Sequence, residues 1–369
     1  MSNVYQERFA QLQNALRVSP FEHLLILPGP NLTYLTGVQL NLSERPAFVV
    51  VSRAKALSWL LPLLEEAQLA HCALPCGAVY TYSDQTGPAA ACEAFGQHLE
   101  WTGQPVGIET RRLRFLELQL LNQAHGPDCQ PADALFAQLR QYKSAAEITL
   151  IRHITRLAEA AWMQTLPMLK VGATEQTIAQ ALCSQLYLHG ASGLGFAPII
   201  ASGSNGANPH AGASARPLQA GDLVTVDWGM QHEAYHTDIT RTYAIASAPV
   251  PLLQQAYTAV QAANAAARAA VKPGVTAAAI DDAARSVIDA AGFGPFFTHR
   301  TGHGLGLEVH EEPDIKTGNI QPLHVGQLFT IEPGIYLPQI GGVRIEDIVV
   351  ITETGHECLT VLPRDLQII

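Results

Sequence analysis

Two aspartates, Asp227 and Asp238, stand at positions where a charged side chain needs a partner. They lie eleven residues apart, and each stands at the edge of an apolar segment. The first segment, 223–226, is rich in β-branched residues and predicts a buried strand. A carboxylate at the end of such a strand is costly unless it is paired, protonated or bound to a metal. The rest of the sequence must therefore supply a partner for these two charges.

An internal repeat supplies two further carboxylates. Six positions recur 102 residues later: Lys170, Gly172, Thr174, Ile178, Ala181 and Gly190 return as Lys272, Gly274, Thr276, Ile280, Ala283 and Gly292. The segment 218–229 then recurs as 323–334, at an offset of 105 residues. Two matches in the same order predict a duplicated half-domain, each half consisting of two helices followed by a pair of strands.

The repeat places the carboxylates in equivalent positions. Asp227 aligns with Glu332, and the strand after each of them carries Asp238 and Glu346, respectively. If the halves pack about a pseudo-twofold axis, the four carboxylates converge. Four carboxylates in one core cannot all be ionised without cations. The sequence therefore predicts a site for two divalent metal ions.

A histidine- and glycine-rich segment lies between the helices of the second half and the strand that leads to Glu332. The segment 298–313 contains His299, His303 and His310 and three glycines. Its Gly-x-Gly-x-Gly spacing is a weak phosphate-loop signal, because no strand-to-helix context supports it. In the first half, His210 stands about where His310 stands in the second. We expect these two histidines to face each other across the metal ions.

The elements that must position these residues form a second domain. Ser144 and Glu147 form a capping-box pattern that opens a long helix to about residue 169. The preceding segment predicts strands at 24–27, 47–52, 78–82 and 106–109 and helices at 57–70, 88–99 and 113–121. We therefore predict an α/β N-terminal domain, 1–140, and an α+β C-terminal domain, 141–369, with an internal pseudo-twofold repeat. The N-terminal domain has no catalytic cluster, and we expect it to serve oligomerisation and to form a wall of the site.

Composition narrows the class of protein. The 369 residues are 48% hydrophobic and 15% charged, which is typical of a packed globular protein. The net charge of −10, without a Lys/Arg cluster, argues against nucleic-acid binding. No apolar segment reaches about 18 residues, so no membrane span is expected. The N-terminus is amphipathic rather than a signal peptide, and the six scattered cysteines indicate reduced thiols; both predict a cytoplasmic protein.

Five motifs together resemble the ligand signature of the pita-bread (M24) metallopeptidases, in the branch of aminopeptidase P and prolidase. They are VDWG with Asp227, TDITRT with Asp238, GHGLGLEVHEEP with His303, IEPGIY with Glu332 and VRIED with Glu346. The resemblance covers the chain from about Ser144 to its end. The smaller α/β N-terminal domain also fits the creatinase/prolidase-like domain of the compact bacterial members.

The resemblance implies a role for each motif residue. Asp227 would bind one metal ion, Asp238 and Glu346 would bridge both, and His303 and Glu332 would bind the other. Because four carboxylates and one imidazole are mostly hard ligands, Mn²⁺ is expected, with Co²⁺, Fe²⁺ or Zn²⁺ possible. Further roles follow for Glu332 as proton shuttle, for His310 and His210 at the substrate carbonyl and oxyanion, for His299 at the proline pocket and for Arg344 as a partner that orients the carboxylates.

The resemblance also implies the substrate, a peptide with proline at its second position. Several prolidases carry an Arg directly after the HExP motif, where it pairs with the carboxylate of a dipeptide, but this chain has Asp314 there. Since Asp314 would repel a carboxylate and Lys316 is flexible, we predict aminopeptidase P-like removal of the N-terminal residue from longer peptides. The alternative is an Xaa-Pro dipeptidase, and a remote alternative is a non-catalytic pita-bread binding protein. A homodimer or homotetramer is expected.

Overall fold

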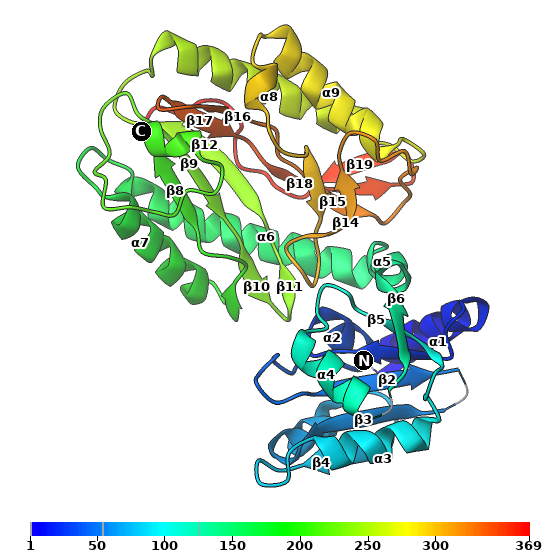
Figure 1. Cartoon of the computed structure of the whole chain (residues 1–369). Helices are drawn as coiled ribbons and strands as arrows, with labels where there is room; N and C mark the ends of the chain where they lie inside the picture. The colour runs from blue at the N-terminus through cyan, green and yellow to red at the C-terminus, as the bar shows by residue number, and fades with distance from the viewer. Residues whose placement is uncertain (1, 54, 125) are drawn as a thin grey trace. The chain divides into compact units, whose positions relative to one another are not determined.

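The computed structural model describes residues 2–53, 55–124 and 126–369. The chain divides into two compact units, Met1–Leu139 and Arg140–Ile369, coloured blue to cyan and green to red in Figure 1. Among the described residues, no helix has the length and apolar character needed to span a bilayer.

The first unit is built on a six-stranded mixed sheet with the strand order β4-β3-β2-β1-β5-β6. Its strands are β1 (His23–Ile26), β2 (Phe48–Ser52), β3 (Leu57–Pro62), β4 (Cys76–Tyr82), β5 (Pro105–Ile108) and β6 (Asp128–Pro131). Its helices are α1 (Ser2–Val18), α2 (Pro30–Thr36), the 3₁₀ helix η1 (Leu63–His71), α3 (Ala89–Leu99), α4 (Phe115–Gln123) and α5 (Asp133–Arg140). Phe95 and Trp101 are fully buried in the core between α3 and the sheet.

The helix predicted at 57–70 is wrong over residues 57–62, whereas Leu63–His71 forms the 3₁₀ helix η1. Residues 57–62 instead form β3, which pairs with β2 on one side and with β4 on the other. Every residue of β3 is buried, so its apolar side chains point to both faces of the sheet. A short run that is apolar on both faces lacks the period of two that marks a half-exposed strand, which is why its sequence does not distinguish it from a buried helix.

The second unit carries the repeat. Its helices are α6 (Ala145–Thr165), η2 (Leu166–Met168), α7 (Glu175–Leu188), η3 (Gly203–Ala207), α8 (Pro251–Ala270), α9 (Ala277–Ala290) and η4 (Gly294–Phe296). Strands of the first half are β7 (Gly193–Leu194), β8 (Ile199–Ser202), β9 (Leu223–Trp228), β10 (Met230–His232), β11 (Tyr235–His236) and β12 (Ile239–Ala244). Those of the second half are β13 (Gly302–Gly304), β14 (Glu311–Ile315), β15 (Leu328–Ile331), β16 (Gly334–Leu337), β17 (Gly341–Arg344), β18 (Asp347–Thr352) and β19 (Gly355–Cys358).

Local contacts repeat as the sequence predicts. Ser144 and Glu147 form the capping box that begins α6. Thr174 and Thr276 cap α7 and α9 in the same way, and they form isolated bridges to Pro217 and Pro322. In each half two antiparallel strands then follow, since β9 pairs with β12 and β15 pairs with β18. The pseudo-twofold repeat is therefore present in the fold.

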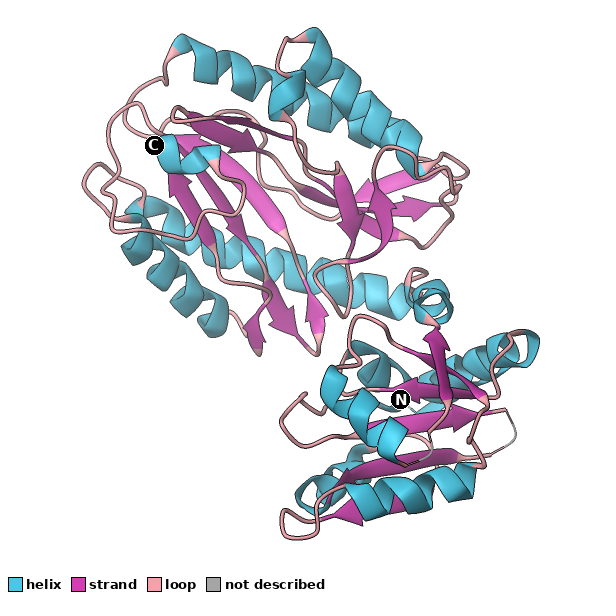
Figure 2. Ribbon diagram, in the orientation of Figure 1, coloured by secondary structure: helices cyan, strands magenta, loops and turns pink. Residues whose placement is uncertain are grey.

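The strands of the second unit lie between two helix pairs, with α6 and α7 on one side and α8 and α9 on the other (Figure 2). Apolar residues of α8 and α9, among them Tyr257 and Ile280, pack with β15–β18 in one continuous core. The halves meet where the Glu346 amide donates to the Thr240 carbonyl, at 3.1 Å. This junction brings the strand ends of both halves to one place.

Candidate metal centre

The five residues predicted as ligands lie on or beside strands of both halves. Asp227 is the fifth residue of β9, and Asp238 directly precedes β12. Glu332 directly follows β15, Glu346 directly precedes β18, and His303 is the middle residue of β13. Because β9 pairs with β12 and β15 pairs with both β13 and β18, the local strand pairing already brings these positions together.

Their side chains converge. Three groups each have ligand atoms within 4.8 Å of one another: Asp227, Asp238 and Glu346; His303, Glu332 and Glu346; and Asp238, His303 and His310. Glu346 belongs to the first and second groups, and Asp238 to the first and third. The two carboxylates that share groups are thus the two that the family resemblance assigns as bridging residues.

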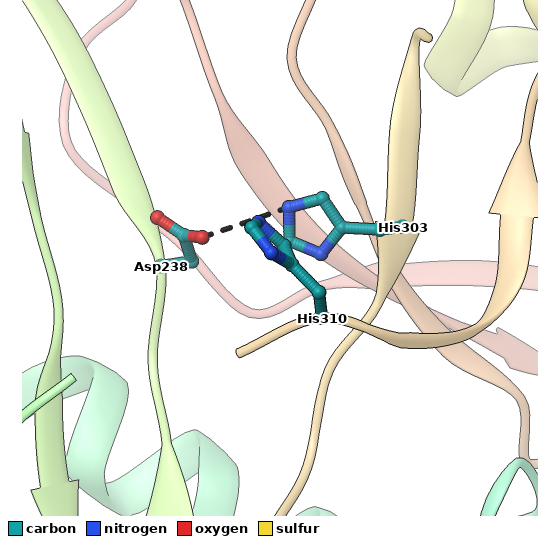
Figure 3. A group of neighbouring side chains, drawn as sticks. All are labelled: Asp238, His303 and His310. Atoms are coloured by element: carbon teal, nitrogen blue, oxygen red, sulfur yellow. Dashed lines mark ion pairs between the residues drawn. The ribbon is translucent and has the colours of Figure 1, made fainter. Parts of the chain in front are cut away.

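His303 is held in an orientation suited to metal binding. Its Nδ1 donates to the carbonyl of Gly304 at 3.1 Å, so Nε2 carries the free lone pair of the neutral ring. This Nε2 lies 3.2 Å from Glu332 and 3.6 Å from Asp238. Figure 3 shows its ring facing Asp238, with the ring of His310 beside it at a centroid distance of 4.2 Å.

The burial of these carboxylates fits a cation. Asp227, Asp238 and Glu346 are 8%, 5% and 1% exposed. One carboxylate oxygen of each (Oδ1, Oδ1 and Oε1) is fully buried and has no hydrogen-bond partner among the described residues. A buried carboxylate oxygen without a donor is destabilising, and a divalent cation would satisfy all three oxygens at once.

The pKa values report the same charge imbalance. Burial, together with the neighbouring carboxylates, raises the pKa of Asp238 and of Glu346 well above the usual range. Burial also raises the pKa of Asp227, against the opposing effect of Arg344. Burial also acts to raise the pKa of Glu332. When no metal ion occupies the Nε2 of His303 and His303 is protonated, its hydrogen bond and charge outweigh burial, and the pKa of Glu332 is lowered. The cluster therefore holds more negative charge than its protein partners neutralise.

Arg344 supplies the nearest cation and orients two members of the centre. Its guanidinium contacts Asp227 Oδ2 at 2.5 Å, Thr240 Oγ1 at 3.1 Å and the Tyr336 hydroxyl at 2.8 Å. Thr240 in turn donates to Glu346 at 2.8 Å. One buried arginine cannot balance four carboxylates, so its place fits the predicted role of aligning them.

The remaining predicted histidines surround the centre. His299 Nε2 lies 2.9 Å from the Tyr336 hydroxyl, and burial lowers the pKa of His299. His310 and His210 are exposed. Although His310 is exposed overall, partial desolvation of its ring and the adjacent His303 lower its pKa to about 4, and His210 is close enough to contribute to that decrease. All nine residues predicted for the site thus lie in one region.

Two features of the site are absent from the sequence prediction. The first is Tyr336, whose hydroxyl links His299 to Arg344. Tyr336 is missing from that prediction, although it lies in the motif IEPGIY and the strand alternation after Glu332 could have indicated it. Glu311, next to His310, is buried between Arg140 and Lys143. These two cations come from the segment before α6, more than 160 residues away, and no local pattern reveals such a pair.

The structure also changes the environment expected for Asp314. Asp314 lies opposite His303 across the β13–β14 pair, so both side chains point to the same face of the sheet. Arg300 and Lys316 both pair with it. These two cations offset the charge of Asp314, although the Glu312 carboxylate also accepts a hydrogen bond from the Asp314 amide at 3.1 Å. The repulsion predicted from Asp314 alone is therefore reduced.

Comparison with known proteins gives two matching family models. The model of metallopeptidase family M24 matches residues 149–353, and that of the creatinase/prolidase N-terminal domain matches residues 8–142. The probable dipeptidase PepE of Mycobacterium bovis is 37% identical over 372 residues, covering 100% of this chain and 97% of that protein. An Xaa-Pro dipeptidase of Pyrococcus horikoshii is 38% identical over 252 residues, covering 68% of this chain and 71% of that protein.

Solved structures give the same picture. A prolidase from Thermococcus sibiricus superposes with a TM-score of 0.93 at 32% identity, covering 99% of each chain. A proline aminopeptidase P from Yersinia pestis has a TM-score of 0.79 at 21% identity, covering 98% of this chain and 96% of that one, and shows the shared fold alone. The comparisons favour the dipeptidase alternative over the aminopeptidase P-like activity that the sequence predicts first.

Proposed function

Because the chain belongs to metallopeptidase family M24, we propose that it hydrolyses the Xaa-Pro bond of dipeptides. The observation that carries this proposal is the buried convergence of four carboxylates and one imidazole, with three carboxylate oxygens that lack a donor. Support for the dipeptide substrate comes from relatives named dipeptidase or Xaa-Pro dipeptidase.

The centre would hold two divalent ions. We assign Asp227 to one ion, His303 and Glu332 to the other, and Asp238 and Glu346 to both, in keeping with the groups that these residues form. When bound, such ions lower the pKa of water and stabilise negative charge on an acyl oxygen. Four carboxylates and one imidazole favour Mn²⁺ among the available metals.

The protein's own groups would then manage the substrate and the proton. The Glu332 carboxylate, partly accessible and 3.2 Å from His303, would accept a proton from water and deliver it to the leaving proline nitrogen. His310 and His210, both exposed at the rim, would donate hydrogen bonds to the scissile carbonyl oxygen. His299, held by Tyr336, would line the proline pocket.

Arg300 explains how the site would accept a free carboxylate. A dipeptide places its C-terminal carboxylate next to the proline, and that charge needs a cationic partner. Arg344 is committed to Asp227 and Tyr336, whereas Arg300 is partly exposed and is held by Asp314. A guanidinium fixed by a carboxylate loses less side-chain entropy when it binds a second one. Arg300 is therefore our proposed anchor for the substrate carboxylate.

The test compares three substrates with metal-loaded enzyme: Ala-Pro, Ala-Pro-amide and Ala-Pro-Gly. Dipeptidase activity predicts the highest kcat/KM for Ala-Pro, with the amide and the tripeptide both poorer. An enzyme that prefers Ala-Pro-Gly would instead be aminopeptidase P-like. Hydrolysis of none of the three would refute Xaa-Pro specificity altogether.

A further inference from the structure

Glu175, the first residue of α7, is a buried carboxylate that takes no part in the centre. It is fully buried, and it accepts hydrogen bonds from three residues of the segment 202–214, which runs from the end of β8 through η3 and the loop that follows. The donors are Ser202 through its amide at 2.7 Å and its hydroxyl at 2.5 Å, Ser214 through its amide at 2.9 Å and its hydroxyl at 2.6 Å, and the Asn205 side chain at 3.1 Å and 3.2 Å. One carboxylate is thus hydrogen-bonded to both ends of the segment 202–214, and we call this set of hydrogen bonds the clamp.

His210 lies within this segment. Its ring is exposed, and its amide donates to the Asn208 side chain at 3.0 Å, a contact within the loop itself. The neighbouring carbonyl of Pro209 accepts a hydrogen bond from Arg344 at 3.3 Å, which ties the loop to the metal centre. Among the described residues no hydrogen bond holds the His210 ring, so the position of the ring follows from how the loop is held.

Residues that follow the loop add further contacts to the clamp. Arg216 donates to the Ser202 hydroxyl at 2.6 Å and pairs with Asp222, also at 2.6 Å. Ser202 thus contacts both a carboxylate and a guanidinium. A charge-assisted network of this kind is stronger than isolated neutral hydrogen bonds, and it limits the loop to one arrangement.

The second half of the repeat uses the same device. Asp281, a buried carboxylate of α9, accepts from the Thr301 hydroxyl at 2.6 Å and from the Thr317 hydroxyl at 2.7 Å. The segment between these two threonines carries His303 and His310. In both halves, then, a helix carboxylate ties together the ends of a histidine-bearing segment.

We propose that Glu175 is a positioning residue for catalysis, which sets the place of the His210 ring opposite His310. This inference rests on the proposed function, since it requires His210 to act on the substrate. A donor on a loop is placed less accurately than one on a helix or strand, and a displacement of about 1 Å can cost about 100-fold in rate. The clamp removes that freedom from the loop.

A double-mutant cycle of Glu175→Gln and His210→Ala tests this role. The side-chain amide introduced by Glu175→Gln would present a donor where the two serines also donate, so the variant would lose part of the clamp while keeping its volume. We expect Glu175→Gln to lower kcat for Ala-Pro by about 10- to 100-fold, with metal content unchanged. In the His210→Ala background the same change should alter kcat less than about twofold.

Glu159→Gln serves as the matched control. Glu159 is also a buried helix carboxylate, but it accepts from the amides of Val361 and Leu362, away from the His210 loop. Its substitution should change kcat by the same small factor with or without His210. Equal losses from Glu175→Gln in both backgrounds, or a His210→Ala variant with the kcat of the unchanged enzyme, would overturn the proposal.

Hydrogen exchange separates this inference from the proposed function. Backbone amides of 203–213 should exchange faster in Glu175→Gln, whatever substrate the enzyme prefers, and unchanged exchange would overturn the clamp. If Glu175→Gln fails to fold, Ser214→Ala removes one donor from the loop side and should give the same pattern more weakly. A protein that shows the exchange effect but hydrolyses no Xaa-Pro peptide would refute the proposed function while leaving the clamp intact.

Discussion

Glu346→Gln should make the metal-free protein more stable and the metal-loaded protein less stable. In the structure, Glu346 Oε2 accepts a hydrogen bond from Thr240, whereas Oε1 is buried without a donor. Glutamine would keep the acceptor for Thr240 and place an amide group, a donor, among the oxygens of Asp227, Asp238 and Glu332. Without metal ions, at a pH at which Glu346 is ionised, the substitution therefore relieves both the missing hydrogen bond and the repulsion between carboxylates.

The size of the effect follows from the unsatisfied oxygen. A buried polar atom without a partner costs about 1–3 kcal/mol. A unit of the size of Arg140–Ile369 shifts its melting temperature by about 2–4 °C per kcal/mol. In chelator, the variant should therefore melt about 2–12 °C above the unchanged protein. With Mn²⁺ at about 1,000 times its Kd, the unchanged protein gains about 4 kcal/mol, while a variant with a damaged site gains less, so the order of the two melting temperatures reverses.

Calorimetry of both proteins, in chelator and in excess Mn²⁺, tests this reversal. Glu159→Gln is the control, because Glu159 has its hydrogen bonds satisfied and lies outside the cluster. It should lower the melting temperature by a similar amount in both conditions. If Glu346→Gln instead destabilises the protein in chelator as much as the control does, the charge imbalance inferred for the centre is refuted.

Two further substitutions probe the substrate side of the site. Arg300→Ala should raise KM for Ala-Pro by about 10-fold or more, as expected for the loss of a charge-assisted hydrogen bond of about 1.5–3 kcal/mol. It should leave KM for Ala-Pro-amide unchanged, because that substrate has no free carboxylate. An equal rise in KM for both substrates would refute the role of Arg300 as carboxylate anchor. Tyr336→Phe removes the hydroxyl that links His299 to Arg344 and should lower kcat/KM about 10- to 100-fold at unchanged metal content; an unaltered kcat/KM would show that this link is dispensable.

Much of the second unit is predictable from sequence because its signals are local and occur twice. Thr174 and Thr276 cap equivalent helices, and each capping residue is followed by the same order of helix and strand pair. The repeat then aligns Asp227 with Glu332 without any knowledge of long-range packing. In the first unit, the sequence predicts a helix where residues 57–62 form a strand, because a strand buried on both faces carries no periodic signal.

The contacts that adjust the site are not predictable from local patterns because they join distant segments. Asp314 taken alone predicts repulsion of a carboxylate, and only the fold places Arg300 against it. Likewise the six hydrogen bonds to Glu175 come from residues 27 to 39 positions later in the chain. Motifs predict which groups take part in the chemistry, whereas tertiary packing determines the charge and the freedom of each group.

Metal titration of chelator-treated protein tests the central claim most directly. Metal content and Ala-Pro hydrolysis are measured together as Mn²⁺ is added. The account predicts no hydrolysis without metal, binding of two ions per chain, and activity that returns as the sites fill. Hydrolysis that survives complete metal removal would contradict it. Full Ala-Pro hydrolysis with no ion bound at this cluster of carboxylates would contradict it as well.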